Sequence, residues 1–337
     1  MTGPRPRVLL SIGDPNGVGP ELSVKTVAAL QGEPSVIPVL VGDRFVVEAY
    51  AQQAGLEVRE TVGSAEPEPG VVDLLPADSL SHQAFQPGTV HAEAGRATVA
   101  YLAMAVEALR RGYARAIVAC PHSETAINAA GIPFSGYPGL LARLAGVDPD
   151  RVFLFLIGGG LRIVHATLHE RLADALGRLT PALVEAAGLA AVDVLRSLGI
   201  ASPRIGVFGV NPHAGEGGLF GEDDDRITAP AVERLRQAGV DVDGPLGADL
   251  LLGRQGFDAF VAMYHDQGHI PVKLLAGRNS TALSIGAGLI FSSVGHGTAF
   301  DIAGKGVADP EAVIRAVRLV GGVSRPAPGP EPVEVSS

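Results

Sequence analysis

Three histidines in this chain occupy places where a metal ion could be bound. His169 ends an apolar run, His213 lies in the polar, glycine-rich stretch 211–218 just after another, and His265 lies in the stretch 263–269 just after a third. The carboxyl ends of parallel strands meet at one edge of a sheet, where open α/β proteins bind ligands. Three imidazoles meeting there would hold a divalent ion with positions left open for substrate oxygens, and such a site polarises a hydroxyl or carbonyl group.

Each of these histidines also has a simpler interpretation. A single His is more often a surface group or a hydrogen-bonded core residue than a metal ligand, and we interpret His165 and His269 in that way. Asp266 could accept a hydrogen bond from a ligating His265, or it could cap the turn that follows. Spacing alone therefore leaves the metal hypothesis open.

Two glycine-rich stretches could approach a nucleotide. Residues 13–21 read Gly-Asp-Pro-Asn-Gly-Val-Gly-Pro-Glu, and residues 295–306 read Gly-His-Gly-Thr-Ala-Phe-Asp-Ile-Ala-Gly-Lys-Gly. Glycines let the backbone turn sharply against a ligand, and a helix N-terminus favours an anion. The first stretch lacks the Gly-x-Gly-x-x-Gly dinucleotide fingerprint, so a tight strand-to-helix turn explains it equally well. The second is equally compatible with a plain turn before the last helix.

The elements that would position these residues follow from apolar patterning. Expected strands cover residues 8–12, 36–41, 116–119, 152–157, 161–167, 204–210, 259–263 and 282–285. Expected helices cover residues 20–30, 92–111, 181–198, 229–238 and 310–320. Alternation of the two predicts a layered α/β fold with a largely parallel sheet. Residues 324–337 hold four prolines and little apolar content, which predicts a disordered tail.

Composition narrows the class of protein. The 337 residues carry a formal net charge of −10 with no basic run, and Trp is absent, which argues against a nucleic-acid partner. The apolar stretch near the N-terminus is too short for a signal or membrane segment. The single cysteine, Cys120, suits a reducing compartment. These features predict a cytoplasmic protein with a small-molecule substrate and neither a membrane nor a nucleic-acid partner.

Taken together and in order, the motifs resemble the 4-hydroxythreonine-4-phosphate dehydrogenase, or PdxA-like, family. Residues 13–21, 126–134, 211–218, 244–249 and 264–268 carry the resemblance, and residues 295–306 are similar to the cofactor loop of isocitrate and isopropylmalate dehydrogenases. The resemblance implies an isocitrate/isopropylmalate dehydrogenase-like fold, in which two α/β domains flank an active-site cleft. On this basis we expect residues 1–128 plus 280–323 on the cofactor side and residues 129–279 to carry the metal, the substrate and the dimer contacts.

The resemblance also implies ligands and roles. It implies a divalent ion (Zn, Co, Mn, Ni or Mg) on His169, His213 and His265, in a homodimer whose active site is shared between subunits. Lys273 is expected to bind a substrate carboxylate or transfer a proton, and Asp249 to be a general base or to orient a ligand. NAD, or alternatively NADP, is expected at the two glycine-rich stretches. The cofactor residues are Gly13, Asp14, Gly17, Gly19, His296, Gly297, Thr298 and Asp301.

Departures from the family pattern bear on the substrate. Members that act on phosphorylated substrates usually carry Lys where this chain has Glu124, Gly-His-Thr-Glu at residues 136–139, and Asn and Arg where it has Ala282 and Phe291. Loss of these cations removes charge-assisted donors for a phosphate. The replacements are similar to a narrower branch, the dehydrogenases of terephthalate cis-dihydrodiol (1,2-dihydroxy-3,5-cyclohexadiene-1,4-dicarboxylate), which matches at residues 119–127, 134–138, 160–165 and 268–271.

This branch implies an oxidative decarboxylation. Hydride would pass to NAD, the new ketone would lie β to a carboxylate, and loss of carbon dioxide would yield the aromatic product protocatechuate. Tyr137 and Phe291 would supply apolar area for a ring, and Arg162 would pair with a carboxylate or form an internal ion pair. One rival is a dehydrogenase of 4-hydroxythreonine 4-phosphate or of a related phospho-threonate or phospho-erythronate. The other is a catalytically silent metal- or nucleotide-binding protein on the same fold.

Overall fold

The structure is a computed structural model of the whole chain and describes residues 5–33, 36–61, 66–134, 136–277, 280–294 and 297–322. The chain divides into two compact units. The first comprises Met1–Val147 and Gly288–Ser324, and the second comprises Asp148–Ala287. The expected disordered tail, residues 324–337, and the predicted cofactor residue His296 lie outside the described residues.

The first unit is built on a parallel sheet. Its strands are β1 (Arg7–Ser11), β2 (Ile37–Asp43), β3 (Glu57–Glu60), β4 (Val71–Ala77), β5 (Ala116–Ala119) and β12 (Leu289–Ser293), in the order β3-β4-β2-β1-β5-β12. Each neighbouring pair is parallel. All four residues of β5 are buried, as expected for a strand whose two faces are both covered by helices.

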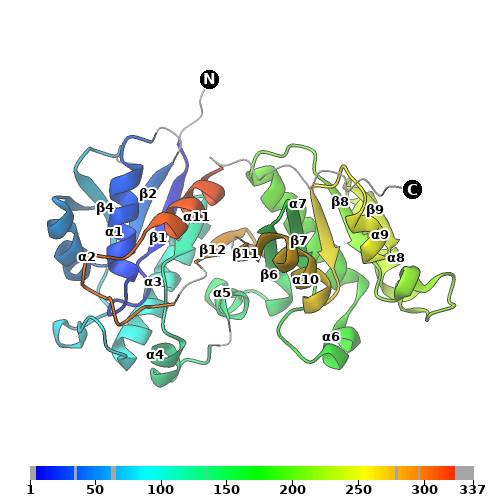
Figure 1. Cartoon of the computed structure of the whole chain (residues 1–337), viewed down its shortest axis with the longest axis horizontal. Helices are drawn as coiled ribbons and strands as arrows, with labels where there is room; N and C mark the ends of the chain where they lie inside the picture. The colour runs from blue at the N-terminus through cyan, green and yellow to red at the C-terminus, as the bar shows by residue number, and fades with distance from the viewer. Residues whose placement is uncertain are drawn as a thin grey trace. The chain divides into compact units, whose positions relative to one another are not determined.

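Helices cover this sheet. They are α1 (Gly19–Leu30), α2 (Arg44–Ala51), α3 (Ala92–Arg110), α4 (Glu124–Ala129), α5 (Tyr137–Ala145) and α11 (Glu311–Gly321), with short 3₁₀ turns at Gln52–Ala54 and His82–Ala84. Helices α1 and α11 pack against each other and on β1, β2 and β5, whereas α3 packs on the sheet together with α4 and α5 (Figure 1). Helix α5 packs on α3 and belongs to the first unit. The domain boundary predicted from the sequence, after residue 128, lies before this helix.

The second unit has a mixed sheet. Its strands are β6 (Phe153–Gly158), β7 (Leu161–His165), β8 (Arg204–Phe208), β9 (Asp241–Leu246), β10 (Ala259–Ala262) and β11 (Thr281–Gly286), in the order β11-β6-β7-β10-β8-β9. The β7, β10, β8 and β9 strands run parallel. Strands β11 and β6 pair antiparallel, as do β6 and β7. The largely parallel sheet predicted from the sequence is thus realised, with an antiparallel part at β6.

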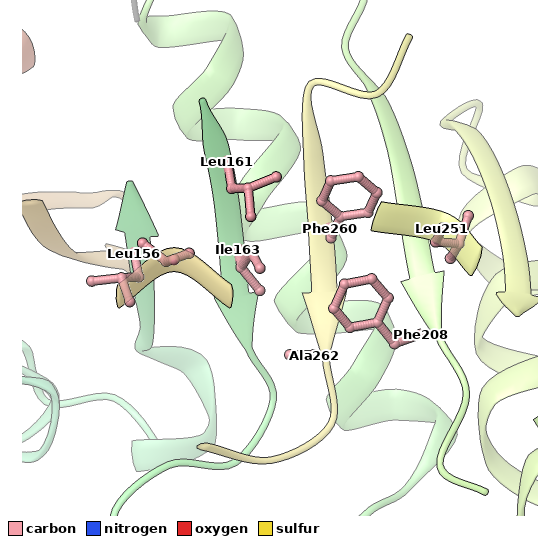
Figure 2. Packing of buried hydrophobic residues seen from close by; sticks show 8 residues of the cluster. Leu156, Leu161, Ile163, Phe208, Leu251, Phe260 and Ala262 are labelled. Carbon is pink, nitrogen blue, oxygen red and sulfur yellow. The ribbon is translucent and has the colours of Figure 1, made fainter. Parts of the chain in front are cut away.

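The helices of the second unit carry or support the predicted metal ligands. They are α6 (Leu172–Arg178), α7 (Pro181–Ser197), α8 (Ala229–Gln237), α9 (Ala248–Leu252) and α10 (His265–Ala276), with 3₁₀ turns at Pro149–Arg151 and Pro212–Gly215 and a π-helical turn at Asp224–Thr228. Figure 2 shows part of the core of this unit, which contains buried residues of β6, β7, β8 and β10. Within it the rings of Phe208 and Phe260 stack, with 5.4 Å between their centroids. Such a pair contributes about 0.5–1.5 kcal/mol beyond its buried area.

The α/β fold predicted from the sequence is confirmed, and the expected strands and helices appear within a residue or two of their expected ends. Residues 265–269, for which no helix was predicted, begin helix α10, which continues through Pro271. Within the described residues, no single helix is long and apolar enough to cross a membrane, although the bent pair Leu172–Arg178 and Pro181–Ser197 meets that test by length and composition.

Candidate active site

His169 and His265 lie together in the second unit. His265 is the first residue of α10, directly after β10, and His169 follows β7, the strand that pairs with β10. Their ring centroids are 5.4 Å apart. A cavity of about 280 Å³ opens between the two segments. It is lined by Leu168, His169, Glu170, Leu172, Ala175, Tyr264, His265 and Asp266. Two of the three predicted ligands therefore share one cavity.

Carboxylates orient two of the predicted metal ligands. The Nδ1 atom of His265 is 2.7 Å from Oδ1 of Asp266, and Nδ1 of His213 is 2.6 Å from Oε2 of Glu216. Each contact fixes the ring and leaves the Nε2 atom available for another ligand. Metal-binding histidines are commonly held in this way, with the second nitrogen bonded to a carboxylate. Of the two roles weighed for Asp266, the contact supports orientation of the imidazole.

His213 sits on an irregular turn, Pro212–Gly215. It adopts a left-handed backbone with φ of 54°, as do Ala214 (54°) and Glu216 (43°). Left-handed residues other than glycine cost about 1–3 kcal/mol each and persist where the surroundings over-determine them. The buried Asp224 carboxylate supplies part of that constraint, because it accepts hydrogen bonds from the amides of Val210 (2.8 Å) and Asn211 (3.0 Å). The turn presents a His213 side chain that is 68% exposed.

One chain does not assemble the complete ligand set. Among the described residues, no three His, Cys, Asp or Glu side chains form a group that could hold a metal ion. The structure brings His169 to His265 and leaves His213 exposed on its own turn. The predicted shared site therefore stays a prediction, considered below with the dimer.

A cluster of histidines adjoins the cavity, and in it His165 and His269 are hydrogen-bonded, in line with one of the two interpretations given to them from the sequence. His165 on β7 is 1% exposed, its Nε2 lies 3.0 Å from Nδ1 of His269, and the rings of His265 and His269 stack at 3.7 Å. Burial, and to a smaller extent the neighbouring imidazoles, lowers the pKa of His165 to about 3 and that of His269 to about 4. Partial burial also lowers the pKa of His169, and the nearby imidazole of His265 lowers it to a smaller extent. The neutral imidazole favoured by these shifts is the form that binds metals.

The buried His165 makes the stability of the metal-free protein depend on pH. Below an ordinary pKa near 6.5 the unfolded chain takes up a proton that folded His165 does not accept until about pH 3, so stability is lost as pH falls through this window. We expect the free energy of unfolding at pH 5.0 to be about 2 kcal/mol below that at pH 7.5, with His269 acting in the same direction. Urea unfolding in a chelator checks this. A His165→Asn variant should show a smaller difference, and an unchanged one would contradict the assignment.

The structure places the other predicted residues of this unit in three different settings. Lys273 is exposed on α10 and donates to Oγ of Ser280 at 2.7 Å. Asp249 is exposed at the start of α9, and its carboxylate lies over Gly247, which also approaches the backbone of His213. Arg162 is only 6% exposed and donates to the carbonyl of Asp258 at 2.9 Å, which favours the internal role weighed for it.

In the first unit, the stretch 13–21 makes a close-packed turn. Residues 11–20 are all buried. Gly13 has φ of 74°, and a Cβ added there would lie 2.2 Å from the carbonyl oxygen of Pro121, while one at Gly19 would lie 2.0 Å from that of Ile12. Burial raises the pKa of Asp14 to about 6. These contacts explain the glycines by packing, which was the simpler interpretation, and the cofactor role of Gly13, Asp14, Gly17 and Gly19 stays a prediction.

The second glycine-rich stretch is fastened to that turn. The amide of Val18 donates to the carbonyl of Thr298 at 2.9 Å, and Gly17 approaches Thr298 closely. Glu21 is 3% exposed and accepts from the amides of Gly306 (3.1 Å) and Ala308 (2.8 Å). Lys25 donates to the Glu21 carboxylate and to the carbonyls of Gly306 and Ala308. The stretch that carries the predicted cofactor residues Gly297, Thr298 and Asp301 is thus held in one conformation.

Tyr137 and Phe291 were expected to face a substrate, but the structure packs them together. Phe291 is 1% exposed, Tyr137 is 8% exposed, and their ring centroids are 4.5 Å apart. The Tyr137 hydroxyl is 2.7 Å from Nδ1 of His122, whose ring also contacts Phe134. Burial lowers the pKa of His122. The cluster of His122, Phe134, Tyr137 and Phe291 is aromatic and uncharged. No role was predicted for His122 from the sequence.

This α/β fold, with paired histidines beside one cavity and a fastened glycine-rich stretch, matches a known family of dehydrogenases. Residues 35–320 match the model of the pyridoxal phosphate biosynthetic protein PdxA, and the chain belongs to the PdxA family. It is 48% identical to 1,2-dihydroxy-3,5-cyclohexadiene-1,4-dicarboxylate dehydrogenase of Comamonas sp, over 95% of this chain and 99% of the relative. It is 37% identical to 4-hydroxythreonine-4-phosphate dehydrogenase of Geobacter metallireducens, over 96% and 97%.

Solved structures show the same two kinds of relative. A terephthalate 1,2-cis-dihydrodiol dehydrogenase from Burkholderia xenovorans LB400 superposes with a TM-score of 0.84 at 54% identity, covering 95% of this chain and 98% of the other. A 4-hydroxythreonine-4-phosphate dehydrogenase from Burkholderia phymatum gives 0.83 at 38% identity, covering 95% and 99%. The family resemblance and the dehydrogenase class expected from the sequence are confirmed.

Proposed function

We propose that the chain oxidises and decarboxylates a cis-dihydrodiol dicarboxylate, converting terephthalate dihydrodiol into protocatechuate with NAD as hydride acceptor. The observation that carries the proposal is its similarity, over 95% of its length, to two proteins named as dehydrogenases of this compound, at 48% and 54% identity. The replaced cations support it, because this chain has Glu124 and Phe291 where members that act on phosphorylated substrates usually carry Lys and Arg.

The proposed reaction is balanced by NAD alone. The ring carbon that bears hydrogen and hydroxyl gives up its hydrogen as a hydride to NAD, and the hydroxyl gives up its proton to a base, which leaves a ketone β to the neighbouring carboxylate. That carboxylate then leaves as carbon dioxide, its bonding electrons enter the ring, and the ring becomes aromatic. Net, one diol diacid and one NAD give one protocatechuate, one carbon dioxide and one NADH. We assign Lys273 to the substrate carboxylate or the proton, and Asp249 to the base or to orienting a ligand.

We propose that His169, His213 and His265 hold a divalent ion (Zn, Co, Mn, Ni or Mg). The carboxylate-oriented rings of His213 and His265 and the lowered pKa of His169 fit this group. When bound, the ion would supply Lewis-acid polarisation of a substrate hydroxyl. We propose further that the first unit binds NAD, or NADP, through residues 13–19 and 297–301, and that the protein is cytoplasmic, as its single cysteine suggests.

The surface beside the predicted metal ligands supports a homodimer with a shared active site. Large apolar side chains are exposed beside the histidine-bearing segments. Ile270 (61%) and Leu274 (81%) are on α10 after His265, and Leu219 (72%) and Phe220 (44%) follow His213. Exposed apolar side chains that gather on one surface are typical of protein–protein contacts. A second copy that covered both segments would bury these side chains and bring a partner histidine to the cavity.

One assay tests the proposed reaction. Purified protein with NAD, a divalent ion and the cyclic dihydrodiol diacid is expected to form NADH, carbon dioxide and protocatechuate in equal amounts. NADH without carbon dioxide would limit the chemistry to oxidation. Turnover of 4-hydroxythreonine 4-phosphate, or of a phosphorylated threonate or erythronate, with none of the cyclic diol would instead establish the alternative, which the 37–39% identical relatives favour.

A further inference from the structure

Gln267 ties two of the histidine-bearing segments together. Its side-chain oxygen accepts a hydrogen bond from the amide of Met263 at 2.7 Å, and its side-chain nitrogen donates to the carbonyl of Gly209 at 2.8 Å. These partners fix which way the amide points, because a backbone N–H can only donate and a carbonyl can only accept. Gln267 therefore contributes one bond to each of two chain segments that are far apart in sequence.

The tie lies where two parallel strands separate. Strands β10 and β8 pair through Val261 and Val207, and Met263 and Gly209 are each two residues further along. Beyond this point the chains diverge, one to His265 and the other to His213. The Gln267 side chain therefore bridges the two strands with hydrogen bonds, as a backbone peptide group would. It does so at the point where the segments that lead to His213 and His265 begin.

The third histidine segment is bonded to the same residue. The hydroxyl of Thr167, two residues before His169, donates to the carbonyl of Met263 at 2.7 Å. Both backbone polar groups of Met263 are therefore held by side chains, and Met263 and Thr167 are almost fully buried. Because the amide and carbonyl of Met263 are buried, these side chains rather than water satisfy their hydrogen bonds.

The geometry points to Gln267 as a positioning residue for the proposed metal centre, with Thr167 as its smaller counterpart. This inference rests on the proposed metal site and adds to it a residue that does not touch the ion. The left-handed turn at His213 is kept by the ties at its base, one from Gln267 to Gly209 and the others from Asp224 to Val210 and Asn211. Loss of the Gln267 amide would let the His213 and His265 segments drift relative to each other within each subunit.

Metal binding to the full-length protein, stripped of metal, tests the inference. Titration with Co²⁺, followed by calorimetry and by the visible absorption of the bound ion, is expected to show weaker binding by about tenfold or more in Gln267→Leu, and a changed spectrum. Gln267→Glu keeps the shape and the acceptor but loses the donor to Gly209, and Thr167→Val loses only its hydroxyl, so both should weaken binding less than Gln267→Leu. Gln237→Glu, an exposed change on α8, is the matched control and should bind as the wild type does.

The outcomes separate this inference from the proposed metal site. If the wild type binds Co²⁺, a His265→Ala variant loses it, and all Gln267 variants bind with unchanged affinity and spectrum, the positioning role is wrong and the metal site stands. If the wild type binds no Co²⁺, both are wrong. If Gln267→Leu fails to fold, Gln267→Glu decides, and unfolding of both would show that the amide holds the sheet rather than the site, which also overturns the inference.

Discussion

Replacing His213 with alanine is expected to lower kcat/KM for the dihydrodiol by at least about 10³-fold and to reduce the metal content of the purified protein. Lewis-acid stabilisation contributes several kcal/mol, and about 4 kcal/mol corresponds to 10³-fold. His213 is exposed and contacts Glu216 and Phe220, which are exposed themselves, so the free energy of unfolding should change by less than about 0.5 kcal/mol. The prediction is therefore a large loss of activity with almost no loss of stability.

The expected behaviour of the neighbouring residues makes this prediction sharper. Glu216 holds the His213 ring through Nδ1, so Glu216→Gln should lower metal affinity about 10–100-fold while leaving the ligand in place. His82→Ala is the matched control, because that histidine stacks on Phe45 in the first unit and lies outside the proposed site. Steady-state NADH formation and metal analysis of each variant are the measurements. Full activity of His213→Ala, or of metal-stripped wild type, would contradict metal-dependent chemistry.

Local apolar patterning predicted most of the fold but missed four strands. Strand β3 reads Glu-Val-Arg-Glu and strand β9 contains Gly244 and Pro245, so neither shows an apolar run, whereas β4 and β12 were missed although both are rich in apolar residues. Helix α10 was not predicted, and Gly268 and Pro271, which both disfavour a helix, lie inside it. Gly268 is nevertheless required, since a Cβ there would lie 2.4 Å from Nε2 of His165. That contact joins residues about a hundred positions apart, and no local pattern announces it.

The candidate site was predictable in part for the same reason. His213 and Glu216 are three residues apart, and His265 and Asp266 are adjacent, so their pairing depends on local sequence. The proximity of His169 to His265 depends on β7 pairing with β10, and the burial of Phe291 depends on helices α3 and α11, which both pack on β12 and leave four of its five residues buried. Residue type alone could suggest that Phe291 offers apolar area, but it could not tell a substrate-facing ring from a buried one.

Substrate selectivity gives the second large expected effect. We expect kcat/KM for the cyclic dihydrodiol diacid to exceed that for 4-hydroxythreonine 4-phosphate by at least about 10³-fold. Each charge-assisted hydrogen bond to a buried anion contributes about 1.5–3 kcal/mol, so the loss of two accounts for about 10²–10⁴-fold. This chain has Glu124 and Phe291 where members that act on phosphorylated substrates usually carry Lys and Arg, so two such donors are replaced.

Charge reversal at Glu124 tests whether electrostatics set this preference. Glu124 is exposed at the start of α4, two residues from His122, and its negative charge acts on both His122 and Tyr137. Glu124→Lys should raise kcat/KM for the phosphorylated substrate by about tenfold, because a change of two charge units near a dianion is worth about 1–2 kcal/mol in a partly solvated site. It should also make inorganic phosphate a better competitive inhibitor. Glu107→Lys, an exposed reversal on α3, should do neither. If the wild type already prefers the phosphorylated substrate, the replaced cations do not set specificity, and the ring dicarboxylate assignment is wrong.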